Sequence, residues 1–259
     1  MPRLSGKRIL VTGAGGGLGR SISERLLGEG ATVVASDYDE AALLKTVTEL
    51  AKPGEISPIL SDLLKDVSIE TLAAEAVRSG AIDGLVNCAG LYPNTPVLDL
   101  GAAEWDQVLG LNLRAPFLLT KALIPSMRER GGAIVNISST ASVLARPGIA
   151  HYGASKAGLS QLTRVLAVEL APLKIRVNAV LPGVIATERV ISKSDTPEAK
   201  AEMAAKVARI PQRRLGTPGE VAPLVAYLLS DEASYVTGAL MTVDGGFSLG
   251  IASYGQDPV

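Results

Sequence analysis

Arg-Ile-Leu-Val-Thr-Gly-Ala-Gly-Gly-Gly-Leu-Gly, residues 8–19, is the stretch that decides the fold of this chain. The run 8–11 predicts a short buried strand, and the glycines after it permit a tight turn that brings the backbone close to a pyrophosphate. A helix that starts after such a turn points free N–H groups and the positive end of its dipole at the phosphates. The pattern Thr-Gly-x-x-x-Gly-x-Gly therefore predicts a dinucleotide-binding turn. No Gly-Lys-Ser/Thr follows it, which disfavours a P-loop nucleotidase.

Outward from this turn, short apolar runs alternate with longer helical patterns. The predicted strands are 8–11, 32–35, 56–60, 84–86, 133–137, 176–180 and 240–243. The predicted helices are 18–28, 39–51, 67–77, 104–128, 152–171 and 220–229. Most strand runs consist of β-branched residues or Leu, which is typical of strands covered on both faces. The alternation predicts an α/β fold of the Rossmann type, a doubly wound, seven-stranded parallel sheet flanked by helices on both faces.

The 259 residues contain no linker-like break, repeat or low-complexity tract, so residues 1–259 are expected to form a single dinucleotide-binding and catalytic domain. Pro116 interrupts the helical pattern 104–128 and predicts a kink or a short break. The stretch 185–214 is too long for a simple connector and carries a helical patch near 198–208, which predicts a mobile lid over a site. The tail 247–259 is longer than the fold requires and is expected to cover a site or a neighbouring subunit.

Composition excludes several classes of function. The 25 basic and 26 acidic residues give a net charge of −1, which provides no electrostatic footprint for nucleic acid or an anionic membrane. Apolar stretches such as 221–229 fall short of a membrane span, and no secretory signal precedes the first strand, so a cytoplasmic protein is expected. A single cysteine, Cys88, and a single histidine, His151, exclude an intramolecular disulfide and an ordinary catalytic zinc site. No metal is expected. Cys88 is interpreted as a small core residue. His151 is interpreted as a packing or polar lining residue, with a substrate contact as the alternative.

Asp37 ends the second predicted strand, eighteen residues after Gly19. A carboxylate at this place accepts hydrogen bonds from the adenosine ribose hydroxyls and repels a 2′-phosphate. No Arg or Lys stands in the glycine turn or directly after Asp37, where a 2′-phosphate would need one. The sequence therefore predicts NAD rather than NADP as the cofactor. The alternative role, an N-cap for the next helix, fits Asp39 better.

Tyr152 and Lys156 stand four residues apart in the predicted helix 152–171, so they project from one face of it. A lysine cation beside a phenol favours the phenolate, which would make Tyr152 a usable acid or base near neutral pH. Ser139 precedes Tyr152 by thirteen residues, at the end of a predicted strand. The pair would be weak support alone, and it gains weight from the glycine turn and from Asp37.

In their order and spacing these motifs resemble the classical short-chain dehydrogenase/reductase family. The resemblance runs from Thr12 to Gly246 and also includes Asp62-Leu63, Asn87-Cys88-Ala89-Gly90, Asn112, Pro182-Gly183 and Asp244-Gly245-Gly246. Cys88 is a small departure, since the family commonly has a second Asn there. The resemblance implies a nicotinamide-dependent enzyme that acts on CH–OH groups and assembles as a homotetramer or dimer.

The resemblance also implies a role for each matching residue. Tyr152 would exchange a proton with the substrate oxygen, while Lys156 would bind the nicotinamide ribose and lower the pKa of Tyr152. Ser139, selected over Ser138 by its spacing from Tyr152, would orient the substrate oxygen. Asn112 would hold a water that links Lys156 to solvent. The implied cofactor-binding set is Gly13, Gly17, Leu18, Gly19, Asp37, Asp62, Leu63, Asn87, Ala89, Gly90, Tyr152, Lys156, Pro182, Gly183, Ile185 and Thr187.

Together these expectations describe an NAD-dependent oxidoreductase that interconverts a secondary alcohol and a ketone by hydride transfer. One alternative is a 3-oxoacyl-[acyl-carrier-protein] reductase, although such enzymes usually prefer NADP, which Asp37 opposes. A non-catalytic dinucleotide-binding sensor is another, disfavoured by the intact set of Ser139, Tyr152 and Lys156. Serine hydrolysis at Ser155 is disfavoured because the one histidine lies just before that serine.

The sequence leaves the substrate open. Its pocket is expected from 91–97, 140–149, His151 and the lid 185–214, which are mostly apolar with Arg146 and Arg189 available, so a moderately apolar small-molecule alcohol or ketone is favoured. No nucleic acid or membrane partner is expected. The resemblance implies that apolar faces of the helices 104–128 and 152–171 are buried between subunits, in a homotetramer or, as the alternative, a dimer.

Overall fold

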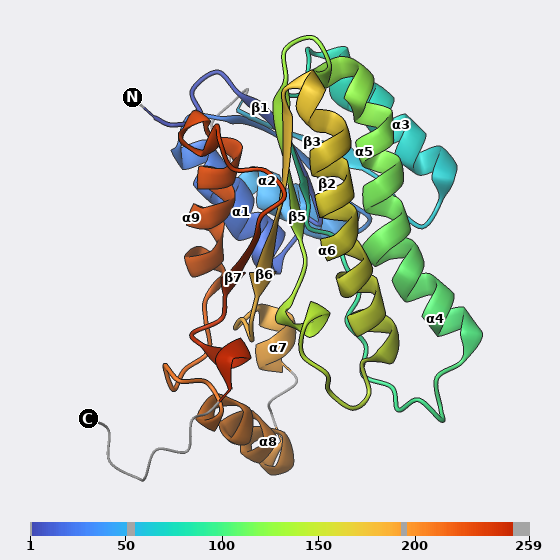
Figure 1. Cartoon of the computed structure of the whole chain (residues 1–259), viewed down its shortest axis with the longest axis vertical. Helices are drawn as coiled ribbons and strands as arrows, with labels where there is room; N and C mark the ends of the chain where they lie inside the picture. The colour runs from blue at the N-terminus through green and yellow to red at the C-terminus, as the bar shows by residue number, and fades with distance from the viewer. Residues whose placement is uncertain (1, 51–54, 193–195, 251–259) are drawn as a thin grey trace.

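The computed structural model describes residues 2–50, 55–192 and 196–250, and these form a seven-stranded parallel sheet between two layers of helices (Figure 1). The strand order is β3-β2-β1-β4-β5-β6-β7. The strands are β1 Arg8–Thr12, β2 Thr32–Asp37, β3 Ile56–Leu60, β4 Gly84–Asn87, β5 Gly132–Ile137, β6 Ile175–Pro182 and β7 Leu240–Val243. The α-helices are α1 Gly17–Gly28, α2 Glu40–Leu50, α3 Asp66–Arg78, α4 Ala102–Leu109, α5 Ala115–Met127, α6 Ala150–Leu170, α7 Glu188–Ile191, α8 Pro197–Ala208 and α9 Pro218–Leu229. The predicted Rossmann-type fold is confirmed.

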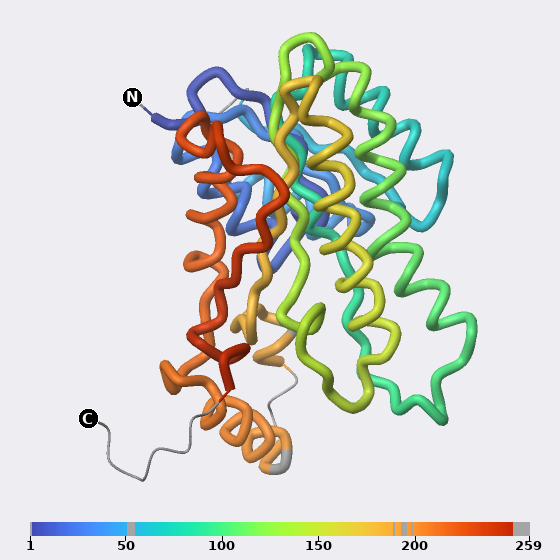
Figure 2. The backbone as a smooth tube through the Cα atoms, viewed as in Figure 1, coloured from blue at the N-terminus to red at the C-terminus, as the bar shows by residue number. Residues whose placement is uncertain are grey.

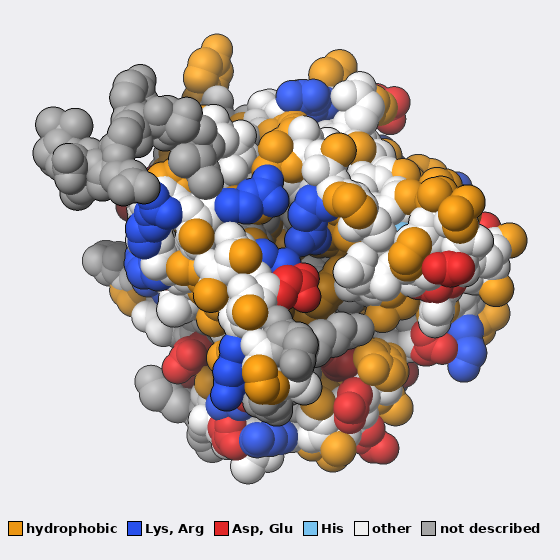
Figure 3. All heavy atoms as spheres, turned by 90° about the horizontal axis from the view of Figure 1, so that it is seen from below, with side chains coloured by type: hydrophobic (Ala, Val, Ile, Leu, Met, Phe, Trp, Pro, Cys, Tyr) orange, Lys and Arg blue, Asp and Glu red, His pale blue; other side chains and the backbone are white. Residues whose placement is uncertain are grey.

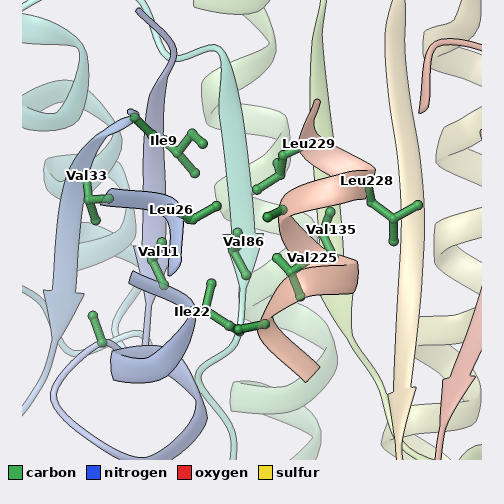
Figure 4. Packing of buried hydrophobic residues seen from close by; sticks show 14 of the residues in the cluster. Ile9, Val11, Ile22, Leu26, Val33, Val86, Val135, Val225, Leu228 and Leu229 are labelled. Atoms are coloured by element: carbon green, nitrogen blue, oxygen red, sulfur yellow. The ribbon is translucent and has the colours of Figure 1, made fainter. Parts of the chain in front are cut away.

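Alternate residues of the central strands enter two separate core layers, because successive side chains of a strand point to opposite faces. Ile9 and Val11 of β1 pack with α1 and α9, whereas Leu10 between them packs with α3 and α5. Figure 4 shows the first layer, in which Ile22 and Leu26 of α1 meet side chains of α9 over the sheet. The continuous apolar runs of the sequence are therefore explained by burial on both faces.

The strand β3 is the exception to this rule. It lies at the edge of the sheet, and Ser57, Pro58 and Leu60 are exposed in it. Proline is tolerated here because an edge strand leaves one row of backbone groups unpaired. The other predicted boundaries agree with the observed elements to within two or three residues over the described part of the chain; Ala51, the predicted end of one helix, lies outside it.

The predicted break near Pro116 is confirmed, but it takes the form of a π-helical turn, η1 Gly110–Arg114, between α4 and α5. Pro116 has no N–H to offer the carbonyl of Asn112, so regular α-helical bonding cannot run through this point. Insertion of a wider turn keeps the axis continuous, and such turns frequently mark functional sites. The interruption thus places Asn112 on the inner side of the helix, where it is fully buried.

The segment Ala102–Met127 is, within the described residues, long and apolar enough to cross a membrane by length and composition, with a mean hydropathy of 1.2. The expectation that every apolar stretch falls short of a span is wrong for this segment, because its apolar residues are spread over two helices and not gathered in one run. Leu119, Leu123 and Met127 are fully buried against the sheet, as in a core helix of an α/β fold.

The ends of the predicted lid are held side by side. The amide of Ala186 donates to Gly216 at 2.8 Å, and the amide of Gly216 donates to Val184 at 3.1 Å. Figure 2 shows that the segment between them, with α7 and α8, lies beyond the carboxyl ends of the strands. The helical patch predicted near 198–208 is confirmed as α8, while residues 193–195 and the tail 251–259 lie outside the described residues. The predicted mobility of the lid and the role of the tail therefore stay predictions.

Candidate active site

The residues selected from the sequence meet at the carboxyl edge of the sheet. The chain leaves β1 toward β2 on one side, whereas β4 continues on the other, so the strand order reverses beside β1. In open α/β sheets, ligands bind at such a switch point. Figure 3 views this end of the molecule and shows a central hollow with basic and acidic side chains on its rim.

At Gly13 and Gly19, the backbone around the glycine turn leaves no room for a side chain. A Cβ at Gly19 would lie 2.0 Å from the carbonyl oxygen of Gly13, and one at Gly13, where φ is +69°, would lie 2.8 Å from the Cα of Ala89. The hydroxyl of Thr12 accepts hydrogen bonds from the amides of Cys88, at 3.0 Å, and Ala89, at 3.2 Å. The turn after β1 is thereby joined to the turn after β4, which brings Gly13, Ala89 and Gly90 to the same edge.

Asp37 closes the glycine turn from the side of β2. Its carboxylate accepts a hydrogen bond from the amide of Gly15 at 2.9 Å and another from Asp39 at 3.1 Å. Each carboxylate oxygen has further lone pairs, which suits it to two neighbouring ribose hydroxyls. Asp39 caps α2 through the amide of Ala42 at 3.0 Å, as the sequence predicts.

The remaining residues of the adenosine side divide into two groups. Asp62 and Leu63 lie in the loop after β3, where Asp62 accepts from the amide of Leu64 at 3.1 Å and Leu63 is buried. Asn87 instead points into the protein, and its amide donates to Asn136 at 2.8 Å. Asn87 therefore supports the central strands, and its predicted part in cofactor binding stays a prediction.

The segment after β6 lies over the glycine turn. A Cβ at Gly17 would be 3.5 Å from the methyl carbon of Thr187, and one at Gly183 would be 2.6 Å from the Cβ of Asp244. The Thr187 hydroxyl is buried without a hydrogen-bond partner among the described residues. Burial of an unpaired hydroxyl is unfavourable, so a ligand group that bonds to it is the physical expectation. Pro182, Gly183, Ile185 and Thr187 thus fit the carboxamide end of a dinucleotide that begins at Asp37.

Tyr152, Lys156 and Ser139 come together at the start of α6. The Lys156 ammonium nitrogen lies 5.9 Å from the centre of the Tyr152 ring, so both side chains are on one side of the helix. The ammonium donates to the carbonyl of Ile137 at 2.8 Å, which leaves it further N–H groups for a ligand. The hydroxyl of Ser139 lies close enough to Tyr152 to lower the pKa of the phenol, as expected for two groups that meet one substrate oxygen.

The pKa of Tyr152 moves in the direction opposite to the one predicted from the sequence. Burial raises the pKa of the phenol above its usual value, and this outweighs the lowering by the hydrogen bond to Ser139 and by the charge of Arg146. Burial also lowers the pKa of Lys156, to about 8. Desolvation opposes the charged form of both groups and dominates when two ionisable side chains share an apolar site. In the protein chain on its own, burial therefore outweighs every lowering contribution, and the predicted effect of Lys156 on this pKa beside a bound cofactor stays a prediction.

Asn112 sits inside the π-helical turn and uses its amide to fix two neighbours. Its nitrogen donates to the carbonyl of Leu91 at 2.8 Å and to the hydroxyl of Ser155 at 3.1 Å, and its oxygen accepts from the amide of Leu91 at 2.8 Å. The first residue of the loop after Gly90 is thus held against α6, close to Lys156. The predicted role of Asn112 in holding a water stays a prediction.

Comparison with known proteins agrees with this geometry. A family model described as Enoyl-(Acyl carrier protein) reductase matches residues 13–248. The chain is 39% identical to a 3-oxoacyl-[acyl-carrier-protein] reductase of Thermotoga maritima, over 94% of this chain and 98% of that protein. The chain belongs to the short-chain dehydrogenase/reductase family. A cyclopentanol dehydrogenase of a Comamonas strain is 38% identical, over 96% and 99% of the two chains. A crystal structure of a putative short-chain dehydrogenase/reductase from Burkholderia xenovorans has a TM-score of 0.91 at 38% identity, over 96% and 99%.

Ser138 and Cys88, two neighbours of the short-chain dehydrogenase/reductase site, make the contacts expected from the sequence. Ser138, the competitor of Ser139, points into the core. Its hydroxyl donates to the carbonyl of Lys156 at 3.0 Å and forms a hydrogen bond with the hydroxyl of Ser160 at 2.8 Å. Burial raises the pKa of the Cys88 thiol to about 12, which makes it an unreactive, partly buried packing residue. The preference for Ser139 and the structural role of Cys88 are consistent with these contacts.

Sequence reasoning included Tyr92 only as part of the expected pocket segment 91–97, and it missed Glu104. The ring of Tyr92 meets that of Tyr152 edge-on, with centres 6.4 Å apart. Glu104 of α4 accepts a hydrogen bond from the ring of His151, which is fully buried next to Tyr152 in the sequence. Neither contact follows a fixed spacing, and only the unusual polar pair His151-Tyr152 hinted that a partner would be needed.

Proposed function

We propose that this short-chain dehydrogenase/reductase is an NAD-dependent enzyme that interconverts a secondary alcohol and a ketone, with Tyr152 as the general acid and base. The observation that carries the proposal is the meeting of Ser139, Tyr152 and Lys156 at the carboxyl edge of the sheet, the edge at which the glycine turn and Asp37 also lie. The relatives named as a cyclopentanol dehydrogenase and a 3-oxoacyl-[acyl-carrier-protein] reductase support an oxidoreductase.

The proposed roles follow from the groups that each side chain presents. Tyr152 donates its proton to the oxygen of a ketone, or receives one from an alcohol, while Ser139 holds that oxygen by a hydrogen bond. Lys156 binds ribose hydroxyls through the N–H groups that it does not use on Ile137. Bound NAD would supply the hydride acceptor for alcohol oxidation, and NADH the hydride donor for the reverse reaction.

The raised pKa of Tyr152 gives the proposal a direction in pH. A phenol with a raised pKa stays protonated at neutral pH, which is the form that donates to a ketone oxygen. Alcohol oxidation needs the phenolate and should gain rate as the pH rises toward the pKa of the enzyme–NAD complex. The positive nicotinamide ring of NAD, together with Lys156, favours the phenolate and would bring this pKa down.

The preference for NAD rests on Asp37. Its carboxylate is held by the amides of Gly15 and Asp39, so it cannot move aside for a 2′-phosphate without loss of those bonds. A phosphate dianion beside a fixed carboxylate is repelled, whereas two ribose hydroxyls are good donors to it.

A second candidate is the reduction of a 3-oxoacyl thioester, which the 39% identity to the Thermotoga maritima reductase favours. Cofactor preference and substrate separate the two. Reduction of acetoacetyl thioesters with NADPH, faster than oxidation of any simple alcohol with NAD, would favour this candidate. Tight binding of NAD without turnover of any substrate would favour the dinucleotide sensor.

The experiment that tests the proposal is a spectrophotometric screen of secondary alcohols and ketones, each with NAD(H) and with NADP(H). The panel should include cyclic alcohols, aliphatic alcohols and 3-hydroxyacyl thioesters. The proposal expects NADH formation with at least one alcohol, with NAD preferred to NADP. Turnover with NADP alone would contradict the assignment of Asp37, and no turnover across the panel would contradict the assignment of Tyr152.

Assembly and location complete the proposal. Phe117 of α5 and Val165 and Val168 of α6 are exposed on neighbouring helices, with Val168 77% exposed. A helix pair with such an apolar outer face is expected to be covered by another subunit, which supports a homotetramer or dimer. Sedimentation of the purified protein tests the assembly. We also propose a cytoplasmic location, as the sequence predicts.

A further inference from the structure

A carboxylate joins three segments that surround Tyr152. The oxygen Oε1 of Glu104, in α4, lies 3.2 Å from Nε2 of His151, and Thr95 donates its hydroxyl to the same oxygen at 2.7 Å. His151 is fully buried at the start of α6, directly before Tyr152, and Thr95 belongs to the loop 91–97 after β4. One oxygen atom of α4 therefore holds both the start of α6 and the loop.

The chemistry of this cluster fixes the protonation of the imidazole. A carboxylate oxygen only accepts, so Nε2 of His151 must carry a hydrogen. Nδ1 is buried without a hydrogen-bond partner among the described residues, and its lone pair or proton reaches no solvent. His151 is thus oriented by Glu104, and its full burial argues against the substrate-contact alternative and favours a positional role.

The loop is also attached to the segment that leads into α6. The amide of Thr95 donates to the carbonyl of Gly148 at 2.8 Å. Gly148 has φ +79°, and a Cβ there would lie 1.8 Å from the side-chain oxygen of Asn94, so the two segments are in direct contact. Position of the loop matters for the reaction, because Tyr92 at its start meets the Tyr152 ring edge-on at 6.4 Å.

Glu104 itself is reachable from outside the cluster. It lines a cavity of about 620 Å³ together with Leu91, Pro93, Ala103, Gln107 and Val108. Its side chain therefore borders this cavity while its oxygen Oε1 takes part in two hydrogen bonds. Bonds to an ionised acceptor are stronger than those between neutral groups, so a single side chain can hold two segments.

We propose that Glu104 is a positioning residue, which sets the loop 91–97 and the His151–Tyr152 end of α6 in the arrangement that the substrate meets. The inference rests on the proposed function, because it takes Tyr152 as the proton-exchanging group. Loss of Glu104 frees the loop and leaves the imidazole of His151 without its acceptor, while the glycine turn and Asp37 stay as they are.

The first test uses the fact that His151 is the only histidine of the chain. Nitrogen-15 NMR of the labelled full-length protein then reports one imidazole, and the tautomer is read directly. The proposal expects a protonated Nε2 in the wild type and in Glu104→Gln, whose amide oxygen still accepts, and a change of the ring signals in Glu104→Ala. A protonated Nδ1 and bare Nε2 in the wild type would overturn it.

The second test measures the loop and the kinetics together. In Glu104→Ala, amide hydrogen exchange of the peptide that covers 91–97 should quicken, and KM for the substrate should rise about tenfold, as expected for two lost bonds to a carboxylate. The NAD dissociation constant should stay unchanged, and Glu104→Gln should restore most of the KM. Asp106→Ala is the matched control, since Asp106 is an exposed acid of the same helix.

The outcomes separate this inference from the proposed function. Equal exchange rates and equal KM in Glu104→Ala and Asp106→Ala would overturn the positioning role even if the enzyme is an active dehydrogenase. A drop in unfolding temperature with unchanged KM would also overturn it, because it would show a role in stability alone. If the wild type shows no turnover, the tautomer and the hydrogen exchange still decide whether Glu104 holds the loop.

Discussion

The half of the site beside β1 and β2 and the half beside α4 and α6 are built in different ways. In the first half, the backbone itself fills the space: Gly19 faces the carbonyl of Gly13, and Gly13 faces the backbone of Ala89. In the second half, single side chains hold the parts together, as Asn112 holds Leu91 and Glu104 holds His151. Few substitutions are possible where the backbone itself fills the space, which suits the binding of one fixed cofactor. Where single side chains hold the parts together, each substitution can change the shape of the site, which suits a substrate that varies between related enzymes.

The largest effect on stability is expected where a side chain is added to the backbone-built half. The Cβ of Gly19→Ala would overlap the Gly13 carbonyl, so the turn must open, with a loss of roughly 1–3 kcal/mol of stability and of NAD binding. Denaturant unfolding and NAD titration measure the two losses. Gly28→Ala at the end of the same helix is the control, because its Cβ would have no neighbour within 4 Å. Equal behaviour of the two variants would refute the account of the turn.

In the other half, Ser139→Ala should leave the fold and NAD binding intact and lower kcat by roughly 10²–10³-fold, the usual result of removing one donor to a developing oxyanion. The variant also loses the hydrogen bond that lowers the pKa of Tyr152, so the pH at which alcohol oxidation accelerates should rise. Steady-state rates from neutral to alkaline pH measure both effects. A small rate loss with an unshifted pH profile would mean that Ser139 does not contact the reacting oxygen.

Asp37→Asn tests the role of the Asp37 charge in cofactor binding, because the substitution removes the charge and keeps the size of the side chain. NAD should bind roughly tenfold more weakly, because a neutral amide is a poorer acceptor for ribose hydroxyls, and the gap between NAD and NADP should narrow. Comparison of kcat/KM for the two cofactors gives the answer. Asp39→Asn removes the same charge two residues away, and a similar change of preference there would argue against a specific role of Asp37.

The smallest effect is expected at Arg146, an exposed residue whose charge lowers the pKa of Tyr152. Removal of this positive charge in Arg146→Gln raises that pKa, so the rise of alcohol oxidation with pH should move slightly to higher pH. Added salt should shrink the shift, since exposed charges are screened. Arg128→Gln, another exposed arginine, is the control, and an equal shift there would exclude a local effect.

The same difference explains how far the sequence alone leads. The glycine turn, Asp37 and the helix-borne pair of Tyr152 and Lys156 could be predicted because each depends on local backbone geometry and short spacing. The first and last residues of the strands could be predicted from apolar runs for the same reason. Glu104 and His151 are 47 residues apart and follow no periodicity, so their contact appears only in the fold.

Two further findings could not be obtained from local patterns. Pro116 announced a break, but the π-helical turn before it depends on how α4 and α5 pack on the sheet. The sign of the Tyr152 shift depends on burial by distant residues, and a pairing argument that considers only Lys156 omits this larger contribution. Desolvation is a property of the tertiary structure, whereas helical spacing is a property of the sequence.

The most direct test of the central claim compares Tyr152→Phe with the wild type in one preparation, by NADH formation from the best alcohol of the screen and by NAD titration. The account predicts a loss of turnover of ~10³-fold or more with unchanged NAD affinity, because the phenylalanine keeps the ring and removes only the group that exchanges the proton. Turnover at the wild-type rate by Tyr152→Phe would contradict it.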